Sequence, residues 1–234
     1  MNRKIIGVIP ARGGSKGIYK KNLVDINGKP MLYYTIKSSI NSNLDRIILS
    51  SEDKDIIKVG KEYGLEVPFI RPKNLSEDNS HTQDVILHAL KWLEENENYK
   101  VHSVMTLQPT SPLRKTNHIN EAINKFIKEG TNSLISINKK TSKPPWWLLK
   151  KNKNGLIDLF FKDYEYPFNL ERQQFPELYS PDGSIFITKR DFLFKNKSLF
   201  DFDNCSYYEI DEKYSIDVDN YVDLEMVKIL MKNE

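Results

Sequence analysis

The sequence predicts an α/β fold in which helices cover a mostly parallel central sheet. Short apolar runs rich in Val, Ile and Leu alternate with segments whose apolar residues recur every three to four positions. The runs are typical of buried strands and the periodic segments of helices, and their alternation is typical of parallel strand–helix–strand units. Polar residues follow several of the runs. We therefore expect ligand-binding residues to gather beyond the carboxyl ends of the strands.

The first half of the chain supplies most of this alternation. Strands are predicted for the apolar runs at 5–10, 46–51, 67–70, 101–107 and 133–137. Helices are predicted for 31–40, for a segment that Asp53 caps and that ends near Gly64, for the segment around 85–93, and for 119–127, which ends at Gly130.

The second half contains a break in the alternation. Between about 139 and 178 the chain is rich in aromatic residues, and neither a helical nor a strand period is present. We interpret this stretch as an arm inserted into a single domain of residues 1–234. Its aromatic residues form either a partner surface or an irregular satellite core. The alternation then resumes with predicted strands at 183–188 and 206–210, an extended segment at 215–219 and a closing helix at 222–231.

Composition excludes several classes of protein. Charged residues make up 29% of the 234 residues, but the formal net charge is only +3 and no basic arm is present, which argues against a nucleic-acid partner. No apolar stretch is long enough to span a bilayer, so we expect no membrane partner. The one cysteine, Cys205, cannot form an internal disulfide, which favours a reducing, cytoplasmic location.

The segment that follows the first predicted strand is the strongest candidate for a binding site. Glycines in residues 11–17 let backbone N–H groups approach an anion, and Arg12, Lys16 and Lys21 add three positive charges within ten positions. A lone glycine-rich stretch is usually a solvated turn. Here the preceding buried strand and the clustered cations favour a polyphosphate site. The spacing is neither that of the Walker loop nor the Gly-x-Gly-x-x-Gly dinucleotide signature.

Two carboxylates near the end of the chain form a candidate metal site. Asp217 and Asp219 are two residues apart, so on an extended segment both side chains point to the same face. Carboxylate oxygens suit a hard cation such as Mg²⁺, with phosphate oxygens and water completing its shell. The alternative is that Asp219 simply caps the last helix. The predicted polyphosphate loop favours the metal site, because phosphates and Mg²⁺ are used together in phosphoryl chemistry.

Several ordered motifs carry a resemblance to one enzyme family. They lie at 9–17 with 21–23, at 71–72 with Leu75 and Asp78, at 107–114, at 172–176 with Tyr179, at 181–186 and at 215–219. Over nearly its whole length the chain resembles the acylneuraminate cytidylyltransferases, or CMP-sialic acid synthetases, and their relatives that act on legionaminic and pseudaminic acids. The resemblance implies a Rossmann-like, GT-A-like nucleotidyltransferase fold, dependence on Mg²⁺ and a homodimer built by the inserted arm. It also implies the reaction: a sugar-acid hydroxyl attacks the α-phosphorus of CTP, and pyrophosphate leaves.

The resemblance also implies a role for individual residues. The catalytic set is Arg12, Lys16, Lys21 and Asp217. The nucleotide-binding set is Ala11, Arg12, Gly13, Gly14, Ser15, Asn22, Arg71, Ser80 and Thr82. The set that contacts the sugar acid is Gln108, Arg172, Tyr179 and Asp182, and the metal ligands are Asp217 and Asp219.

Three departures from the family pattern bear on the substrate. Tyr19 stands where proline is usual, Asp182 precedes Gly183 where asparagine is usual, and residues 145–147 are Pro-Trp-Trp where a lysine for the sugar is often found. These changes suggest a different or bulkier sugar, such as a diacetamido nonulosonate. They also leave open a relative that joins a sugar 1-phosphate to GTP or another nucleotide. A third alternative is a non-catalytic nucleotide-binding protein of the same fold, against which the retained cations and aspartate pair argue.

Overall fold

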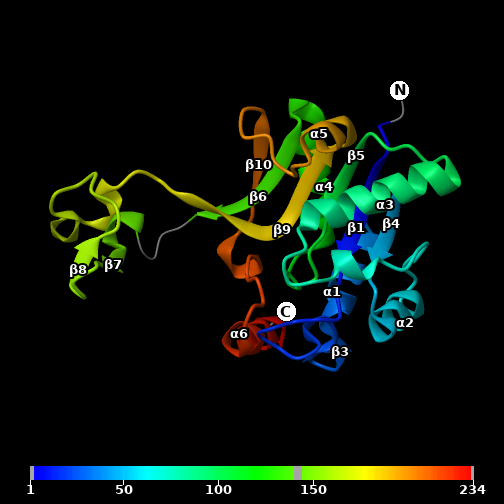
Figure 1. Cartoon of the computed structure of the whole chain (residues 1–234), viewed down its shortest axis with the longest axis horizontal. Helices are drawn as coiled ribbons and strands as arrows, with labels where there is room; N and C mark the ends of the chain where they lie inside the picture. Colours follow the sequence, from blue (N-terminus) through cyan, green and yellow to red (C-terminus); the bar gives the residue numbers. More distant parts are fainter. Residues whose placement is uncertain (1–2, 140–143, 233–234) are drawn as a thin grey trace.

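A six-stranded sheet lies at the centre of the computed structural model, which describes residues 3–139 and 144–232 (Figure 1). The strand order is β10–β6–β9–β5–β1–β4, and every neighbouring pair is parallel except those that include β9. The predicted mostly parallel sheet is therefore confirmed. The strands are β1 (Ile5–Pro10), β4 (Arg46–Ser50), β5 (Ser103–Thr106), β6 (Ser133–Lys139), β9 (Tyr179–Lys189) and β10 (Cys205–Glu209).

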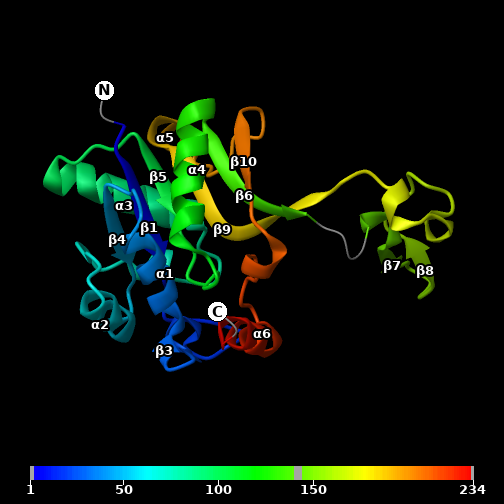
Figure 2. The ribbon, with the colours of Figure 1, turned by 180° about the vertical axis from the view of Figure 1, so that it is seen from behind.

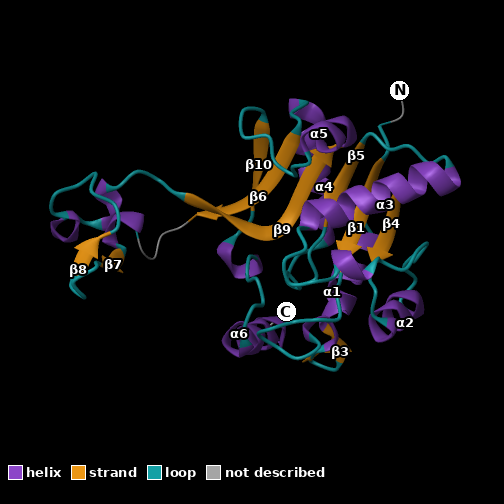
Figure 3. Cartoon of the chain, viewed as in Figure 1, coloured by secondary structure: helices purple, strands orange, loops and turns teal. Residues whose placement is uncertain are grey.

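Helices cover both faces of this sheet (Figures 1 and 2). On one face α1 (Met31–Ile40), α2 (Lys54–Glu62) and α4 (Thr116–Glu129) bury residues such as Ile36, Ile56 and Phe126 in one apolar cluster. On the other face α3 (Thr82–Glu97) and α5 (Arg190–Asn196) form a second cluster around Leu90 and Leu193. This three-layer arrangement explains why the strands are apolar on both faces. Figure 3 shows the strands in orange between the purple helices.

A third, smaller core joins the two ends of the chain. The closing helix α6 (Tyr221–Lys232) packs near the hairpin of β2 (Asp25–Ile26) and β3 (Lys29–Pro30), and its residues Leu224 and Val227 share an apolar cluster with Ile26 and Val218. The hairpin turns at Asn27 and Gly28, both at positive φ, as a two-residue turn of this kind requires. This core places the segment before α6 beside the segment that follows β1.

Local signals predicted the helix ends correctly. The Asp53 side chain accepts hydrogen bonds from the N–H groups of Asp55 and Ile56 at the start of α2. Gly130, at a φ of 69°, ends α4, and Gly64, at a φ of 87°, follows α2. Both are positions that glycine occupies without steric cost.

One of the predicted strands is absent from the structure. Residues 67–70 form no strand, because Pro68 has no N–H to donate and the chain makes only one bridge to β4, between Ile48 and Glu66. The segment 215–219, predicted only as extended, is neither helix nor strand. Helix α5 and both short hairpins were not predicted from the sequence.

None of the helices in the described residues combines the length and the hydropathy that a membrane span requires.

The arm leaves the sheet between β6 and β9 and extends away from it (Figure 1). It contains the hairpin of β7 (Leu149–Lys151) and β8 (Ile157–Leu159) and three 3-10 turns, η3 (Pro145–Trp147), η4 (Pro167–Asn169) and η5 (Arg172–Gln174).

An aromatic cluster forms the core of the arm. The Trp146 ring stacks on that of the buried Phe175, with the ring centroids 5.0 Å apart and the ring planes at 7°. Tyr164 and Trp147 contact the same phenyl ring edge-on. The Trp147 indole N–H donates to the carbonyl of Pro167 at 2.8 Å. The arm thus has a satellite core of its own, and it also leaves apolar side chains exposed, namely those of Leu148, Leu149, Leu156, Ile157, Phe160, Phe161, Tyr166 and Phe168.

Candidate active site

A cleft of about 450 Å³ opens beyond the carboxyl ends of β1 and β5. The predicted glycine loop (residues 11–17) forms one wall, and Asp219, from the far end of the sequence, lies on the same cleft. Parallel strands deliver their polar loops to one edge of a sheet, which explains the convergence. Of the predicted site residues, those that line the cleft are Arg12, Gly14, Ser15, Lys16, Lys21, Asn22, Arg71, Ser80, Thr82, Gln108 and Asp219.

Hydrogen bonds and close packing fix the backbone of the glycine loop. Asn22 donates through Nδ2 to the carbonyl of Arg12 at 2.8 Å, and the N–H of Ala11 donates to the carbonyl of Ser50 at 3.0 Å. Gly17 lies so close to the carbonyl of Asp219 that any side chain there would overlap it. Glycine at this position is therefore what lets the loop reach the segment that carries the aspartates.

A carboxylate that the sequence analysis did not assign to the site holds two of the loop cations. Asp78 lies 3.0 Å from Arg12 Nη1 and 3.0 Å from Lys16 Nζ, and Arg12 also donates to the carbonyl of Glu77 at 2.9 Å. Hydrogen bonding to Lys16, with the charges of both cations, lowers the pKa of Asp78 below its usual range. Both of these cations of the cleft lining are therefore paired with a carboxylate of the protein.

The third loop cation contacts the aspartate segment directly. Lys21 Nζ donates to the carbonyl of Val218 at 2.9 Å and to Oδ1 of Asp219 at 3.0 Å. The N–H of Val218 in turn donates to the carbonyl of Thr110 at 2.8 Å. These contacts tie the aspartate segment both to the glycine loop and to the loop after β5.

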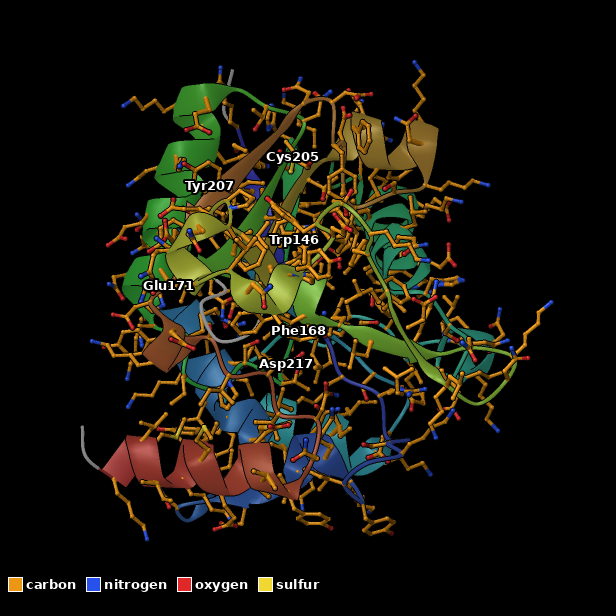
Figure 4. All side chains as sticks on the ribbon, turned by 90° about the vertical axis from the view of Figure 1, so that its left-hand side faces the viewer. Trp146, Phe168, Glu171, Cys205, Tyr207 and Asp217 are labelled. Carbon is orange, nitrogen blue, oxygen red and sulfur yellow. The ribbon has the colours of Figure 1, made fainter. Side chains whose placement is uncertain are left out.

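The two aspartates stand in different environments. Asp219 is largely exposed and pairs with Lys21, whereas Asp217 lies next to Gly183 and Thr110. Loss of solvation raises the pKa of the Asp217 carboxyl, and the negative charge of Asp219 adds to this shift. The buried Val218 between them packs into the third core, as the alternation of an extended segment predicts. Figure 4 shows Asp217 on the segment that leads to α6.

The donor set at this position fits Mg²⁺. A divalent cation would offset the charge that Asp219 places beside the partly desolvated Asp217, and oxygen ligands are those that Mg²⁺ prefers. Within residues 3–139 and 144–232, no three His, Cys, Asp or Glu side chains form a group able to hold a metal ion. A pair of carboxylates is nevertheless sufficient where substrate phosphates and water supply the remaining ligands.

Another part of the cleft lining contains a buried cation, Arg71. The Arg71 side chain donates to the hydroxyl of Ser50 at 3.1 Å and to the carbonyl of the same residue. Burial lowers the pKa of Arg71 to about 10, and the negative charge of Glu52 opposes that shift. Ser80 closes the adjoining turn, since its hydroxyl donates to the carbonyl of Asn74 at 3.0 Å and accepts from the N–H of Glu77.

The loop after β5 is supported from behind by an arginine that the sequence analysis did not select. Arg114 is fully buried and donates to the carbonyls of Gln108 at 3.2 Å and Ser184 at 2.7 Å, and to the hydroxyl of Thr35 at 2.8 Å. Gln108 itself lines the cleft. Arg114 thereby fixes the position of the predicted sugar-contacting glutamine relative to the sheet.

The other predicted sugar-contacting residues do not reach this cleft. Asp182 is buried in β9, where it accepts hydrogen bonds from the hydroxyls of Ser136 and Ser184, so its carboxylate is engaged within the sheet. Tyr179 lies at the base of the arm and donates to Glu177 at 3.2 Å. The side chain of Arg172 lies outside the described part of the structure. Ala11, Gly13 and Asp217 are adjacent to the described cleft lining and not part of it.

An enzyme that transfers nucleotidyl groups has to hold a triphosphate and a divalent cation together, and this cleft collects residues suited to both. We therefore class the protein as a nucleotidyltransferase. A sequence model described as cytidylyltransferase matches residues 6–233. The chain belongs to this cytidylyltransferase family.

Named relatives and a solved structure agree with that assignment. A pseudaminic acid cytidylyltransferase of Campylobacter jejuni subsp. jejuni serotype O:23/36 (strain 81-176) is 32% identical over 236 residues, covering 98% of this chain and 97% of the relative. A CMP-N,N'-diacetyllegionaminic acid synthase of Legionella pneumophila is 30% identical over 231 residues, covering 98% and 97%. The structure of a CMP:2-keto-3-deoxy-manno-octonic acid synthetase complexed with CTP aligns with a TM-score of 0.71 at 17% identity, covering 98% of this chain and 99% of that one. At that identity the structural match supports the fold.

Proposed function

We propose that this protein transfers a cytidylyl group from CTP to a nonulosonic acid, giving a CMP-sugar and pyrophosphate. The observation that carries the proposal is the meeting of the glycine loop and Asp219 on one cleft, with Lys21 joining them. The names of the relatives, which include cytidylyltransferases for pseudaminic and diacetyllegionaminic acids, support the choice of nucleotide and sugar class.

In this proposal the loop cations bind the triphosphate. Arg12 and Lys16 exchange their contact with Asp78 for phosphate oxygens, and Lys21 acts from the opposite side. Their positive charges stabilise the negative charge that develops on pyrophosphate as it leaves. Phosphoryl chemistry of this kind depends on positioning and charge neutralisation, so no nucleophilic protein side chain is needed.

Asp217 and Asp219 are the residues that would hold Mg²⁺. When bound there, the ion supplies Lewis-acid stabilisation of the phosphate oxygens. Asp217 is held between Gly183 and the loop after β5, so its carboxylate has a fixed place relative to the sheet. Asp219 is free to exchange its pairing with Lys21 for the cation.

Arg71, Ser80 and Thr82 form the wall proposed to contact the nucleoside, together with Asn22 beside the loop. Gln108 is proposed to contact the sugar acid. Arg172 is proposed to contact the sugar acid as well. For Tyr179 the same role requires that it reach a cleft other than the one in its own chain, because it lies at the base of the projecting arm (Figure 1).

That arrangement supports a homodimer in which the arm is the interface. Its exposed apolar side chains, among them Leu149, Ile157 and Phe160, are of the kind that associating surfaces bury. Sedimentation velocity at several protein concentrations tests this assembly, and a species of monomer mass throughout would contradict it. A cytoplasmic location is proposed on the unpaired Cys205.

No residue now favours the alternative that uses GTP and a sugar 1-phosphate. Asp182 and Trp146 motivated it, but Asp182 is bonded to two serines inside the sheet and Trp146 is stacked on Phe175 within the arm.

A matrix of pyrophosphate release tests both functions. The four nucleoside triphosphates are each combined with pseudaminic, legionaminic and sialic acids and with several sugar 1-phosphates, with and without Mg²⁺. We expect release with CTP, Mg²⁺ and one of the nonulosonic acids. Release with GTP and a sugar phosphate would instead establish the alternative.

A further inference from the structure

The glycine loop rests on a turn that lies outside the cleft. This turn, residues 51–53, directly follows β4, and Glu52 Oε1 accepts a hydrogen bond from the N–H of Gly13 at 2.7 Å. On the same side, a Cβ placed on Gly13 would lie 2.5 Å from Oδ2 of Asp53. Gly13 therefore packs closely against the turn, and any side chain at this position would overlap Asp53.

The second oxygen of Glu52 is also informative. Oε2 is buried and has no hydrogen-bond partner in the part of the chain that the structure describes. Its charge interacts favourably with the buried Arg71, whose other charged neighbour is the like-charged Arg12. The Glu52 carboxylate thus contacts the glycine loop through Gly13 and offsets the charge of Arg71, a buried arginine of the cleft lining.

We propose that Glu52 is a positioning residue for nucleotide transfer: it fixes the backbone of the glycine loop through Gly13 and compensates the charge of Arg71. Glu52 is absent from the cleft lining, so it acts through these two residues and not by touching the nucleotide. The effect of Glu52 on catalysis rests on the proposed cytidylyl transfer, whereas its hydrogen bond to Gly13 does not depend on that proposal.

Kinetics of three variants test the functional part. Glu52→Ala removes the acceptor and the charge, and we expect kcat/KM for CTP to fall about tenfold or more, since hydrogen bonds to charged groups are among the stronger ones. Glu52→Gln keeps an oxygen for Gly13 but removes the charge beside Arg71, so its kcat/KM should lie between those of Glu52→Ala and the wild type. The matched control is Glu62→Ala, an exposed glutamate at the end of α2, which should be unchanged.

Hydrogen exchange without nucleotide tests the loop contact alone. We expect the amides of residues 12–17 to exchange faster in Glu52→Ala than in the wild type, with little change in Glu52→Gln and none in Glu62→Ala. Unchanged exchange in Glu52→Ala, or wild-type kinetics, would overturn the proposal. A loss of activity that follows a general fall in melting temperature, with no selective effect on the loop, would also overturn it. Faster loop exchange in a protein that does not transfer cytidylyl groups would refute the proposed function and leave the loop contact standing.

Discussion

Lys21 and Asp219 stand 198 positions apart in the sequence, and their side chains meet at 3.0 Å between Nζ and Oδ1. The pair joins the loop proposed to bind phosphate to the segment proposed to bind Mg²⁺. It exists because α6 and the β2–β3 hairpin share a core that brings the two ends of the chain together. Folding of that small core is therefore a condition for assembling the site.

The pair is expected to act as a unit in catalysis. Lys21→Met and Asp219→Asn should each lower kcat/KM for CTP. The double variant should lose less than the product of the two single losses, because Lys21 is proposed to bind the phosphates and Asp219 the Mg²⁺ that shares them. The matched control is the exposed pair of Lys228 and Glu225 on α6, 2.7 Å apart, whose variants should have wild-type kinetics. If the loss in the double variant equals the product of the two single losses, the shared role is contradicted.

Asp217→Asn tests the role proposed for Asp217 as a Mg²⁺ ligand. Replacing a carboxylate by an amide removes a charge that Mg²⁺ needs, and we expect kcat to fall about 100-fold or more while CTP still binds through the loop cations. Pyrophosphate release and titration calorimetry measure the two effects. Asp203→Asn, at an exposed position, is the control. Equal turnover in the two variants would exclude Asp217 as a ligand.

Asp78→Asn should strengthen nucleotide binding. Asp78 holds Arg12 and Lys16 when no phosphate is present, so it competes with the triphosphate for them. We expect KM for CTP to fall a few-fold at low ionic strength, and the difference to shrink as salt screens the exposed charges. A rise in KM would mean that Asp78 instead orients these side chains for binding.

Phe175→Ala should loosen the arm without unfolding the body. Phe175 is the ring that Trp146, Trp147 and Tyr164 all contact, and removing a buried phenylalanine costs about 3 kcal/mol or more. We expect limited proteolysis within the arm to accelerate at least about tenfold while the main melting transition stays in place. Phe168→Ala, at an exposed ring of the same arm, is the control.

Acid should destabilise the fold through the buried His118. Burial lowers the pKa of His118, so the folded state favours its neutral form, although Glu121 opposes the shift. The unfolded state takes up a proton below its ordinary pKa of about 6.5, and the stability gained from the neutral ring is lost as pH falls through that range. Melting temperature should therefore fall less with acid in His118→Asn than in the wild type. Exposed His81→Asn should keep the wild-type slope.

Features that depend on neighbours in sequence could be predicted well. The cap at Asp53, the helix end at Gly130 and the glycine loop each follow from a few adjacent residues. The convergence of polar loops on one edge followed from the alternation of strands and helices alone. The strand predicted at 67–70 is absent because Pro68 has no N–H to donate to a strand ladder. The prediction rested on the apolar run and did not take this residue into account.

Features that depend on distant partners could not be predicted. Asp182 lies within the motif at 181–186 and its position suggests a ligand contact, but the hydroxyl of Ser136, 46 residues earlier in the chain, donates a hydrogen bond to it. Glu52 carries no motif of its own, and its role appears only when β1 and β4 lie side by side and bring Gly13 to it. Such residues acquire their function from strand order, which no local pattern encodes.

The arm continues the ladder of β6 and β9 beyond the body. Ile137, Asn138 and Lys139 pair with Pro181, Ser180 and Tyr179 at its base. The direction in which the base of the arm leaves the body therefore follows the twist of the central sheet. A change of register in these last pairs would turn every aromatic side chain of the arm toward a new direction at once, so the geometry of any assembly that it forms is set inside the sheet.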